Sequence, residues 1–440
     1  MPAKQLKVAL VSLGCPKNLI DSEKMLATLA EGGCVVGAPL ARSDVILINT
    51  CGFMASARRE SLEAVAEAVA RKNRGKARRV VVAGCLATRD ATRLYAAAPG
   101  IDAVVGVNDR EEILSAVLGK GRFTRLSPPP LHPHAIASDA GRFRLTPRHT
   151  AYLRIAEGCS RRCTFCTIPA IRGPMRSKPP GMVADEAAEL VADGAVELNI
   201  IGQDTTSYGQ DLPGRTDLAS LLRRLDAIKG LRWLRLMYAY PRRMNRRIIG
   251  AMAECPRVVH YLDLPLQHIA DPILRRMGRG VGRKATEKLL ADLRGAMSDI
   301  VLRTTFIVGF PGETERDFRQ LLRFVREFRF GAVGVFEFSP EEGTPAAGMS
   351  GQVPPRVRAA RVEELMLAQQ EIAFQANRQM VGKRLEVLVD GVNPAGRCVG
   401  RYFGQASEVD SVCLLKRRRT PGRFHRMKVV GWKDYDLIVD

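Results

Sequence analysis

Three cysteines stand close together in the run Gly158-Cys159-Ser160-Arg161-Arg162-Cys163-Thr164-Phe165-Cys166, with the spacing Cys-x3-Cys-x2-Cys. Thiolates are soft ligands that suit zinc, copper(I) and iron–sulfur clusters. Structural zinc normally has four protein ligands, often as paired Cys-x2-Cys units, and no fourth Cys or His stands near these three. A [4Fe–4S] cluster held by three thiolates leaves one iron open to a substrate or cofactor. The spacing therefore favours a reactive cluster over a zinc site or a disulfide loop.

A second set of cysteines, Cys15, Cys51 and Cys85, is spread along the N-terminal region, and each has a glycine beside it. Each directly follows a predicted strand, and the carboxyl ends of parallel strands lie side by side at one edge of a sheet. Glycine allows close backbone approach there. We therefore predict a second cluster with an open iron; the alternative is three buried core cysteines. The other cysteines share no pattern and are expected in the core or at the surface: Cys34, Cys255, Cys398 and Cys413.

Short apolar strands and amphipathic helices alternate over residues 1–120, which predicts a parallel-sheet α/β domain. The expected strands are Gln5–Leu13, Asp44–Asn49, Arg79–Ala83 and Ala103–Val107, with helices over Asp21–Ala30 and Ser56–Ala70. The proline-rich stretch Ser127–Thr150 is predicted to be a linker.

The alternation restarts at Tyr152 and predicts an α/β domain of six strand–helix units, an open (β/α)6 barrel with its site at the carboxyl ends of the strands. The expected strands are Tyr152–Ala156, Ala195–Ile201, Trp233–Tyr240, His260–Leu266, Leu302–Val308 and Ala332–Phe338. The expected helices include Met182–Ala192, Leu218–Ile228, Glu315–Phe328 and Val357–Met380. From Gly382 on, short strands separated by glycines and charges predict a small antiparallel β-barrel; they are Leu385–Val389, Gly396–Tyr402, Glu408–Leu414, Arg426–Val430 and Leu437–Val439.

The Cys-x3-Cys-x2-Cys run with an aromatic residue before its last cysteine resembles the radical S-adenosylmethionine (SAM) enzymes. Two three-cysteine sets in this order, followed by a small β-barrel, resemble the methylthiotransferase family over essentially the whole chain. The resemblance implies two [4Fe–4S] clusters, one on Cys15, Cys51 and Cys85 and one, which cleaves SAM, on Cys159, Cys163 and Cys166. It also implies four segments: an N-terminal methylthiotransferase domain over 1–125, a linker over 126–148, a radical SAM domain over 149–376 and a TRAM domain over 377–440.

Finer motifs separate the branches of that family. The run Ser12-Leu13-Gly14-Cys15-Pro16-Lys17-Asn18 resembles the branch that methylthiolates the β-carbon of an aspartate in small-subunit ribosomal protein S12 and consumes two SAM per turnover. The branch that modifies C2 of a tRNA adenosine usually has Gln-Met-Asn after that cysteine. The basic tail, with Lys416-Arg417-Arg418-Arg419, departs from the first branch and keeps a contact with tRNA or ribosomal RNA open. The resemblance implies a sulfur donor and an electron donor that the sequence does not identify.

Five further residues are candidates for SAM binding, each with a plainer alternative. Phe165 is expected to pack near the cluster or adenine, or in the core. Gln203 and Gln267 follow predicted barrel strands and contact either SAM or loop backbone groups. In the loop after the fifth strand, Gly309 either lets the backbone approach the adenosine of SAM closely or is required by a turn with a positive φ. Glu313 in the same loop either binds the ribose or caps the next helix.

The composition sets outer bounds on function. No apolar run is long enough to span a membrane, the N-terminus does not resemble a signal peptide, and ten cysteines without such a signal favour a cytoplasmic protein with metal ligands over disulfides. The formal net charge of +22 favours a polyanionic partner such as RNA or a ribonucleoprotein, or reflects a solvated basic surface. Three functions therefore remain: an S12 methylthiotransferase, a tRNA methylthiotransferase, and a non-catalytic RNA-binding protein with structural metal clusters.

Overall fold

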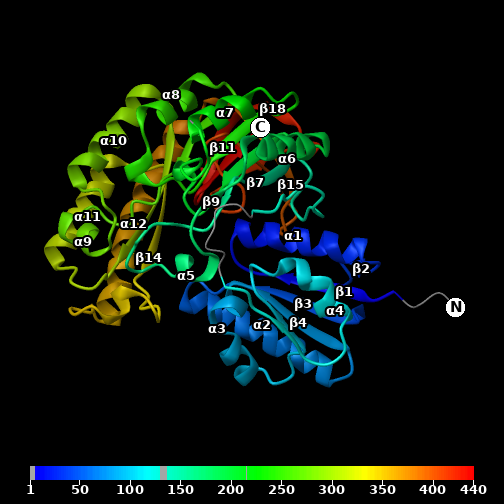
Figure 1. The fold of residues 1–440 in the computed structure, drawn as a ribbon. Coiled ribbons are helices and arrows are strands. Elements are labelled where there is room, and N and C mark those ends of the chain that lie inside the picture. The colour runs from blue at the N-terminus through cyan, green and yellow to red at the C-terminus, as the bar shows by residue number, and fades with distance from the viewer. Residues whose placement is uncertain (1–4, 129–135, 215) are drawn as a thin grey trace. The chain divides into compact units, whose positions relative to one another are not determined.

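The structure is a computed structural model that describes residues 5–128, 136–214 and 216–440 (Figure 1). The chain divides into two compact units. The first consists of Met1–Leu145, Ala156–Arg161 and Cys166–Ser177, and the second of Thr146–Ile155, Arg162–Phe165 and Lys178–Asp440. Residues 129–135, in the predicted linker, lie outside the described residues. In the described part of the chain no helix is long and apolar enough to cross a membrane.

The first unit contains a parallel sheet in the order β2-β1-β3-β4-β5-β6. Its strands are β1 (Lys7–Ser12), β2 (Val35–Val36), β3 (Val45–Thr50), β4 (Arg79–Gly84), β5 (Ala103–Val105) and β6 (Phe123–Arg125). Its helices are α1 (Pro16–Glu31), α2 (Ala55–Asn73), α3 (Cys85–Ala97), α4 (Ile113–Leu118) and α5 (Ile168–Arg172), and β8 (Ala156–Glu157) pairs with β9 (Arg176–Ser177).

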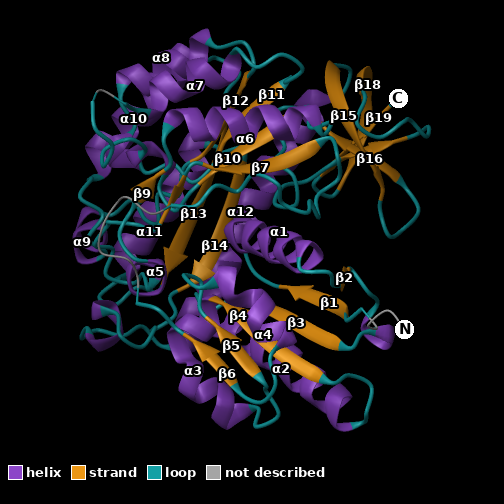
Figure 2. Ribbon diagram, turned by 45° about the vertical axis from the view of Figure 1, so that its right-hand side comes forward, coloured by secondary structure: helices purple, strands orange, loops and turns teal. Residues whose placement is uncertain are grey.

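The central strands β3 and β4 are buried along their whole length, as expected of a parallel sheet covered on both faces. Side chains of α2 and α3 form one core cluster with Ile46 and Val80. Side chains of α1 and α4 form another with Val45 and Val81, so helices cover both faces (Figure 2). The prediction of a parallel-sheet α/β domain is therefore confirmed.

Some predicted boundaries in this unit are wrong. Strands β2 and β6 were not predicted, because edge strands of two or three residues carry too little alternation to be recognised. Helix α1 begins at Pro16 rather than Asp21, since proline fits the first position of a helix, where no backbone N–H is needed.

The second unit contains a six-stranded parallel sheet in which strands consecutive along the chain are neighbours, in the order β14-β13-β12-β11-β10-β7. Its strands are β7 (Thr150–Arg154), β10 (Glu197–Ile201), β11 (Trp233–Leu236), β12 (Val258–Asp263), β13 (Val301–Val308) and β14 (Ala332–Glu337). Its helices are α6 (Pro180–Ala192), α7 (Leu218–Asp226), α8 (Arg246–Glu254), α9 (Asp271–Arg276), α10 (Arg283–Ala296), α11 (Glu315–Phe328) and α12 (Pro355–Met380). This is the predicted (β/α)6 order, open between β7 and β14.

Strand β11 ends four positions before the predicted end at Tyr240. The chain leaves the sheet because Tyr238 has a positive φ of 57°, and its backbone N–H donates to the Asp263 carboxylate instead of a neighbouring strand. Helix α11 spans the predicted residues, with a capping box between Thr314 and Asp317 at its start.

The C-terminal strands form the expected closed barrel in the order β15-β16-β17-β19-β18. They are β15 (Arg384–Val392), β16 (Cys398–Arg401), β17 (Cys413–Leu415), β18 (Phe424–Lys433) and β19 (Asp436–Val439). The pairing is antiparallel except between β17 and β19, which are parallel. The predicted strand Glu408–Leu414 is wrong before Cys413, because the chain turns at Glu408, which has a φ of 66°.

A buried group of charges joins this barrel to the six-stranded sheet. The carboxylate of Glu197, on β10, accepts hydrogen bonds from Arg235 on β11 and from Arg401 on β16. All three side chains are almost completely buried. Arg401 also pairs with Asp390, which accepts from His149 if that ring is protonated at Nε2. The barrel is therefore fixed to the sheet by the almost completely buried charges of Glu197, Arg235 and Arg401.

Candidate iron–sulfur and S-adenosylmethionine sites

Cys15, Cys51 and Cys85 follow three adjacent strands of the first unit, β1, β3 and β4, at their carboxyl ends. Cys15 is the residue that precedes α1, and Cys85 is the first residue of α3. The alternation of strands and helices thus brings three residues that are far apart in sequence to one edge of the sheet.

Glycines allow the three cysteine-bearing turns to approach each other. A Cβ atom on Gly14 would lie 2.9 Å from the Cβ of Cys51, and one on Gly52 would lie 2.8 Å from the carbonyl carbon of Cys85. Gly84 has a φ of 98°, and a Cβ there would lie 2.2 Å from Oδ1 of Asn49. Any larger residue would push the turns apart, so these glycines are needed for the gathering of the thiols.

The thiols lie in each other's electrostatic field. Burial raises the pKa of Cys51, and the charge of Cys15 raises it further. Burial raises the pKa of Cys85 to about 11, with Cys15 adding to the rise and Arg172 opposing it. Burial also acts to raise the pKa of Cys15, but Lys17, Arg172 and nearby backbone N–H groups together hold it below its usual value. One thiol of the set is therefore poised to ionise first and act as a ligand.

The donor set fits an iron–sulfur cluster better than a single ion. Across the residues described, no three His, Cys, Asp or Glu side chains are placed to hold one metal ion. A four-iron cluster does not need such a point of convergence, because each thiolate binds a different iron. Three thiols at one sheet edge, with glycines where a Cβ would fill the space, meet that requirement.

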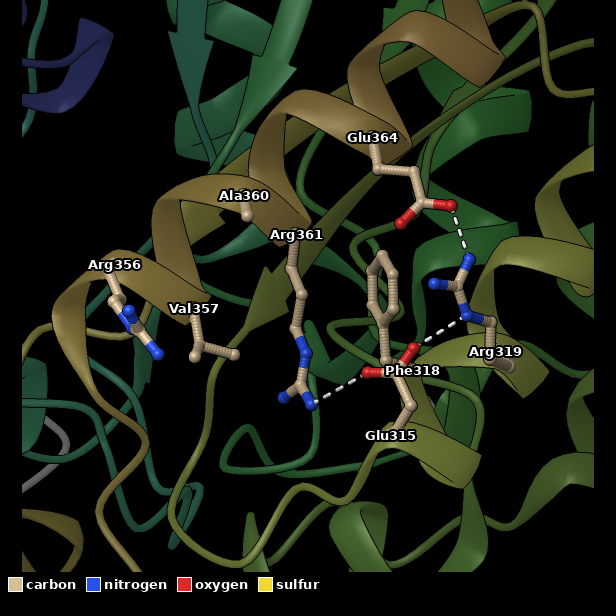
Figure 3. A pocket seen from close by; sticks show the side chains of 8 residues that line it. All are labelled: Glu315, Phe318, Arg319, Arg356, Val357, Ala360, Arg361 and Glu364. Carbon is tan, nitrogen blue, oxygen red and sulfur yellow. Dashed lines mark hydrogen bonds and ion pairs between the residues drawn. The ribbon is translucent and has the colours of Figure 1, made fainter.

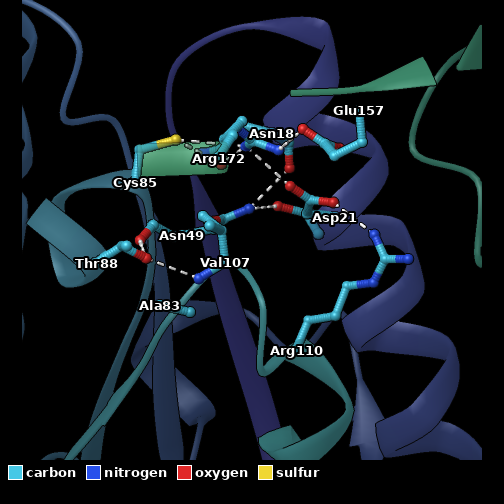
Figure 4. A network of polar contacts seen from close by, with 12 residues as sticks. Asn18, Asp21, Asn49, Ala83, Cys85, Thr88, Val107, Arg110, Glu157 and Arg172 are labelled. Carbon is cyan, nitrogen blue, oxygen red and sulfur yellow. Dashed lines mark hydrogen bonds and ion pairs between the residues drawn. The ribbon is translucent and has the colours of Figure 1, made fainter. Parts of the chain in front are cut away.

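A buried polar network supports this sheet edge (Figure 4). The amide of Asn18 donates to the carbonyls of Leu13 and Thr50, just before Cys15 and Cys51. Asn49 donates in turn to the carbonyl of Asn18. These side-chain bonds replace backbone pairing where the strands end, and they fix the turns that carry the cysteines.

The cysteines of the second set lie in differently packed segments. The backbone N–H of Cys159 donates to the carbonyl of Gly173 at 3.0 Å within the first unit, and Gly158 before it has a φ of 78°. Within the second unit, the Sγ of Cys163 accepts a hydrogen bond from Arg279 at 3.6 Å. Cys159 is buried, whereas Cys163 and Cys166 are partly exposed.

The structure places the SAM-site candidates in loops of the second unit. Phe165 packs edge-on against Phe310, with ring centroids 6.4 Å apart. Gln203 is partly buried in the loop after β10. Gln267 has a φ of 72° and forms an isolated bridge with Phe306 of β13, while its buried side-chain Oε1 has no hydrogen-bond partner in the described part of the chain. An orphaned buried acceptor of this kind fits a ligand that donates hydrogen bonds.

Gly309 and Glu313 both lie against arginine side chains of α12, and Glu313 also accepts a hydrogen bond from its own loop. Gly309 has a φ of 72°, and a Cβ there would lie 2.1 Å from Cγ of Arg358. The Glu313 carboxylate accepts from the backbone N–H of Phe310 at 3.1 Å and pairs with Arg361 at 3.0 Å. Helix α11 is capped by Thr314, not by Glu313.

His268 lies beside Glu313, 3.8 Å from its carboxylate, and its ring is completely buried. Burial lowers the pKa of His268 to about 3 and raises that of Glu313 to about 7. Nε2 of His268 has no hydrogen-bond partner among the residues that are described. Burial therefore favours the neutral ring of His268 and a proton on Glu313, and the nearby Arg361 opposes the protonation of Glu313.

A hollow of about 370 Å³ lies between α11 and α12 (Figure 3). Arg319 lies between the carboxylates of Glu315 and Glu364 and pairs with both. The hollow is lined by Glu315, Phe318, Arg319, Arg356, Val357, Ala360, Arg361 and Glu364. None of the sequence-predicted site residues is among them.

Sequence reasoning missed the arginines that touch the thiols. Arg172 contacts Cys85 and Arg279 contacts Cys163. Each is far along the chain from the cysteine it contacts or lies among many other arginines, so composition and spacing gave no signal for either. His268, the residue after Gln267, is not among the residues predicted from the sequence to bind SAM.

Comparisons with known proteins agree with this arrangement. Residues 153–325 match the model of the radical SAM superfamily, residues 7–106 that of the uncharacterized protein family UPF0004, and residues 381–440 that of the TRAM domain. The three matches fall on most of the first sheet, on most of the six-stranded sheet and on the whole closed barrel. The fold and the cysteine sets thus define a radical SAM enzyme of the methylthiotransferase class.

Relatives of similar length narrow the class. The chain is 45% identical to "Ribosomal protein uS12 methylthiotransferase RimO" of Anaeromyxobacter sp. (strain Fw109-5), over 98% of this chain and 92% of that protein. It is 45% identical to the protein of the same name from Pelotomaculum thermopropionicum, and 42% to that from Geobacter sulfurreducens, over 98% of each chain in both cases. The chain belongs to the RimO family. As a radical SAM enzyme, it uses an iron–sulfur cluster and SAM.

Solved structures share the fold at low identity. The radical SAM methyltransferase TsrM from Kitasatospora setae superposes with a TM-score of 0.55 at 15% identity, over 88% of this chain and 79% of that one. The cobalamin-dependent radical SAM enzyme OxsB gives 0.51 at 12% identity, over 83% of this chain and 56% of that one.

Proposed function

We propose that this enzyme replaces a hydrogen on the β-carbon of an aspartate of ribosomal protein S12 by a methylthio group. The proposal rests on one observation: the chain carries both three-cysteine sets while matching proteins named uS12 methylthiotransferase over nearly its whole length. The run around Cys15, with Pro16, Lys17 and Asn18, supports the ribosomal-protein branch over the tRNA branch.

We further propose two [4Fe–4S] clusters, held by Cys15, Cys51 and Cys85 and by Cys159, Cys163 and Cys166. When bound, these clusters and SAM supply the electron, the radical and the methylthio group that substitution at an unactivated C–H bond requires. The protein itself would hold the clusters, orient SAM and the substrate, and exclude water from the site. Burial of Cys85 and Cys159 shields these two sulfur atoms from water, whereas the other four proposed ligands are partly exposed.

The remaining candidates are proposed to shape the SAM pocket in the second unit. Gln203 and Gln267 would accept or donate hydrogen bonds at the ends of β10 and β12, and Phe165 would offer a ring edge. Gly309 and Glu313 would act through the loop they belong to: the Glu313 carboxylate holds the Phe310 backbone N–H, so it fixes the loop's course.

We propose that the protein works in the cytoplasm, because its proposed substrate is a ribosomal protein. We also propose that its functional domains are residues 1–125, 149–376 and 377–440, with a linker over 126–148. The exposed basic run Lys416–Arg419 is proposed to contact RNA near the substrate, since positive side chains in water attract the phosphate backbone. The sulfur and electron donors are proposed to be separate partners.

The proposal is tested by intact mass spectrometry of ribosomal proteins from cells with and without the gene. We expect S12 to be heavier by about 46 Da, the mass of a methylthio group in place of hydrogen, only where the gene is present. A matched strain that carries Cys166→Ala should give the unmodified mass. Unmodified S12 in the strain with the intact gene would refute the substrate assignment.

One observation favours a second candidate, the methylthiolation of tRNA: the basic run on the barrel is exposed to water. Mass spectrometry of tRNA nucleosides from the same strains separates the two. A gene-dependent methylthioadenosine together with unmodified S12 would establish the tRNA reaction.

The number of clusters is tested by iron analysis of the full-length chain. The parent should bind about eight irons, and replacing either cysteine set by alanine should leave about four. Replacing Cys34, Cys255, Cys398 and Cys413 by alanine is the matched control and should leave about eight. Four irons in the parent would refute the two-cluster proposal.

A further inference from the structure

Arg172, the last residue of α5, is a buried arginine that touches a cysteine of the N-terminal set. Its Nη2 donates to the Sγ of Cys85 at 3.3 Å and to Asp21 at 3.0 Å, and its Nη1 donates to Glu157 at 2.9 Å. Its side chain is only 3% exposed. Figure 4 shows the guanidinium between the sulfur and the two carboxylates.

The network around Arg172 is not an ordinary ion pair. A buried guanidinium is normally satisfied by carboxylates, which Asp21 and Glu157 supply. Asp21, however, is shared with a second arginine, Arg110, at 2.8 Å. The negative charge of Asp21 is therefore divided between two arginines and balances the charge of Arg172 only in part. Nη2 of Arg172 also donates to the Cys85 thiol, which would carry a negative charge as a metal ligand.

The sequence position of Arg172 adds a second argument. It lies in the segment Cys166–Ser177, which begins with a cysteine of the other set, yet this segment packs in the same compact unit as the N-terminal sheet. A residue encoded in the region that matches the radical SAM model therefore contacts the site of the N-terminal set.

We propose that Arg172 is a positioning residue that orients the Cys85 thiolate and raises the reduction potential of the cluster bound by Cys15, Cys51 and Cys85. A positive charge and an N–H donor on a cluster thiolate stabilise the reduced form, which carries one more negative charge. The inference rests on the proposed second cluster.

The test uses the full-length chain with Cys159, Cys163 and Cys166 replaced by alanine, so that a single cluster is present. After anaerobic loading with iron and sulfide, its potential is measured by a redox titration followed by electron paramagnetic resonance. Four further variants are made in this background: Arg172→Met, Arg172→Lys, Glu157→Gln and Arg110→Met.

Arg172→Met should lower the ratio of reduced to oxidised cluster at a fixed potential about tenfold, which is about 59 mV for a one-electron couple. Arg172→Lys keeps the charge and should recover most of that loss. Glu157→Gln removes an anion beside Arg172 and should raise the ratio. Arg110→Met is the matched control. It removes a positive charge beside Asp21, the carboxylate that Arg110 shares with Arg172, but Arg110 donates to no thiol of the described residues. It should change the ratio of reduced to oxidised cluster less than about twofold.

The outcomes distinguish a failure of the role proposed for Arg172 from a failure of the proposed N-terminal cluster. A background chain that binds no iron refutes the second cluster. A background chain that binds about four irons, with Arg172→Met keeping both the iron and the parent potential, refutes the role of Arg172 alone. If Arg172→Met binds no cluster, Glu157→Gln decides: a raised ratio supports the role and an unchanged ratio overturns it.

Discussion

Replacing Glu197 by glutamine should strongly destabilise the second unit. The Glu197 carboxylate lies at the centre of the charges that join the barrel to the six-stranded sheet, 3.0 Å from Nη2 of Arg235 and 2.7 Å from Nη2 of Arg401. Glutamine has the same shape but no charge, so two guanidinium groups would remain buried with less compensation. Breaking a buried pair in this way costs roughly 3–5 kcal/mol.

The pKa of Glu197 reflects the same two ion pairs. Burial would raise this pKa, but Arg401 and Arg235 lower it from 4.5 to about 2. A difference of about 2.5 units corresponds to about 3 kcal/mol at neutral pH. Because the folded-state pKa is the lower one, this stability is present above about pH 4.5 and is lost as the pH falls toward 2. The cost of Glu197→Gln should therefore shrink over the same range.

The assay is urea unfolding of the full-length chain under reducing conditions, followed by tryptophan fluorescence. The chain has two tryptophans, and Trp233 on β11 packs against Phe424 of the barrel with ring centroids 4.8 Å apart. In a Trp432→Phe background, the remaining fluorescence reports on the junction of barrel and sheet. Glu197→Gln should lower the midpoint strongly.

A surface pair at the same junction is the matched control. Glu386 on β15 pairs with Arg232, just before β11, at 2.7 Å, and both side chains are half exposed. Exposed pairs contribute about 0–1 kcal/mol, so Glu386→Gln should move the midpoint little. If Glu197→Gln costs no more than Glu386→Gln, the reasoning about buried charge is refuted.

Three further predictions concern a turn, a loop and the basic run. Gly84→Ala should cost at least about 3 kcal/mol in thermal unfolding, because φ is 98° and the new Cβ would also meet Asn49. Gly75→Ala is the control: φ is also positive there, 69°, but nothing lies within 4 Å, so it should cost only the roughly 1–2 kcal/mol of a left-handed backbone. Equal costs at the two positions would contradict the crowding at Gly84. Burial raises the pKa of Glu313 to about 7, so the folded protein binds this proton more tightly than the unfolded chain; the resulting stability should be present below about pH 4.5 and lost as the pH rises through 7. Glu313→Gln should reduce the difference in unfolding free energy between about pH 5 and about pH 8. An undiminished difference would contradict the raised pKa of Glu313. Arg418→Gln should reduce the salt dependence of binding to a ribosomal RNA fragment by about one unit of slope, whereas an unchanged slope would show that Arg418 contacts no phosphate.

The placement of Cys15, Cys51 and Cys85 at one sheet edge could be predicted because it depends only on local patterns. Each follows an apolar strand, and parallel strands order their carboxyl ends together. The errors came where short-range patterns were misleading. Val409 and Val412 are β-branched residues of the kind enriched in strands, but the backbone N–H of Asp410 donates to the carbonyl of Ala406, and the chain turns there.

The contacts of Arg172 could not be predicted, because its partners come from three different parts of the chain. Asp21 lies on α1, Cys85 starts α3, and Glu157 ends β8. No spacing rule relates an arginine to residues 87 and 151 positions away. The same limit applies to His268 and Glu313, whose contact depends on how two loops pack.

The net charge of +22 is carried by the surface, because among the described residues the buried carboxylates balance the buried arginines and lysines. Arg154, Arg235 and Arg401 are among the largest fully buried side chains, and the last two are compensated by Glu197 in a closed group of charges. Arg235 and Arg401 hold the barrel on the sheet and are not available to a polyanion. The charge available to RNA is that of exposed residues such as those in the run Lys416–Arg419. The buried arginines therefore leave the positive charge of the surface undiminished, and the net charge alone does not decide between a ribosomal protein and a tRNA as the substrate.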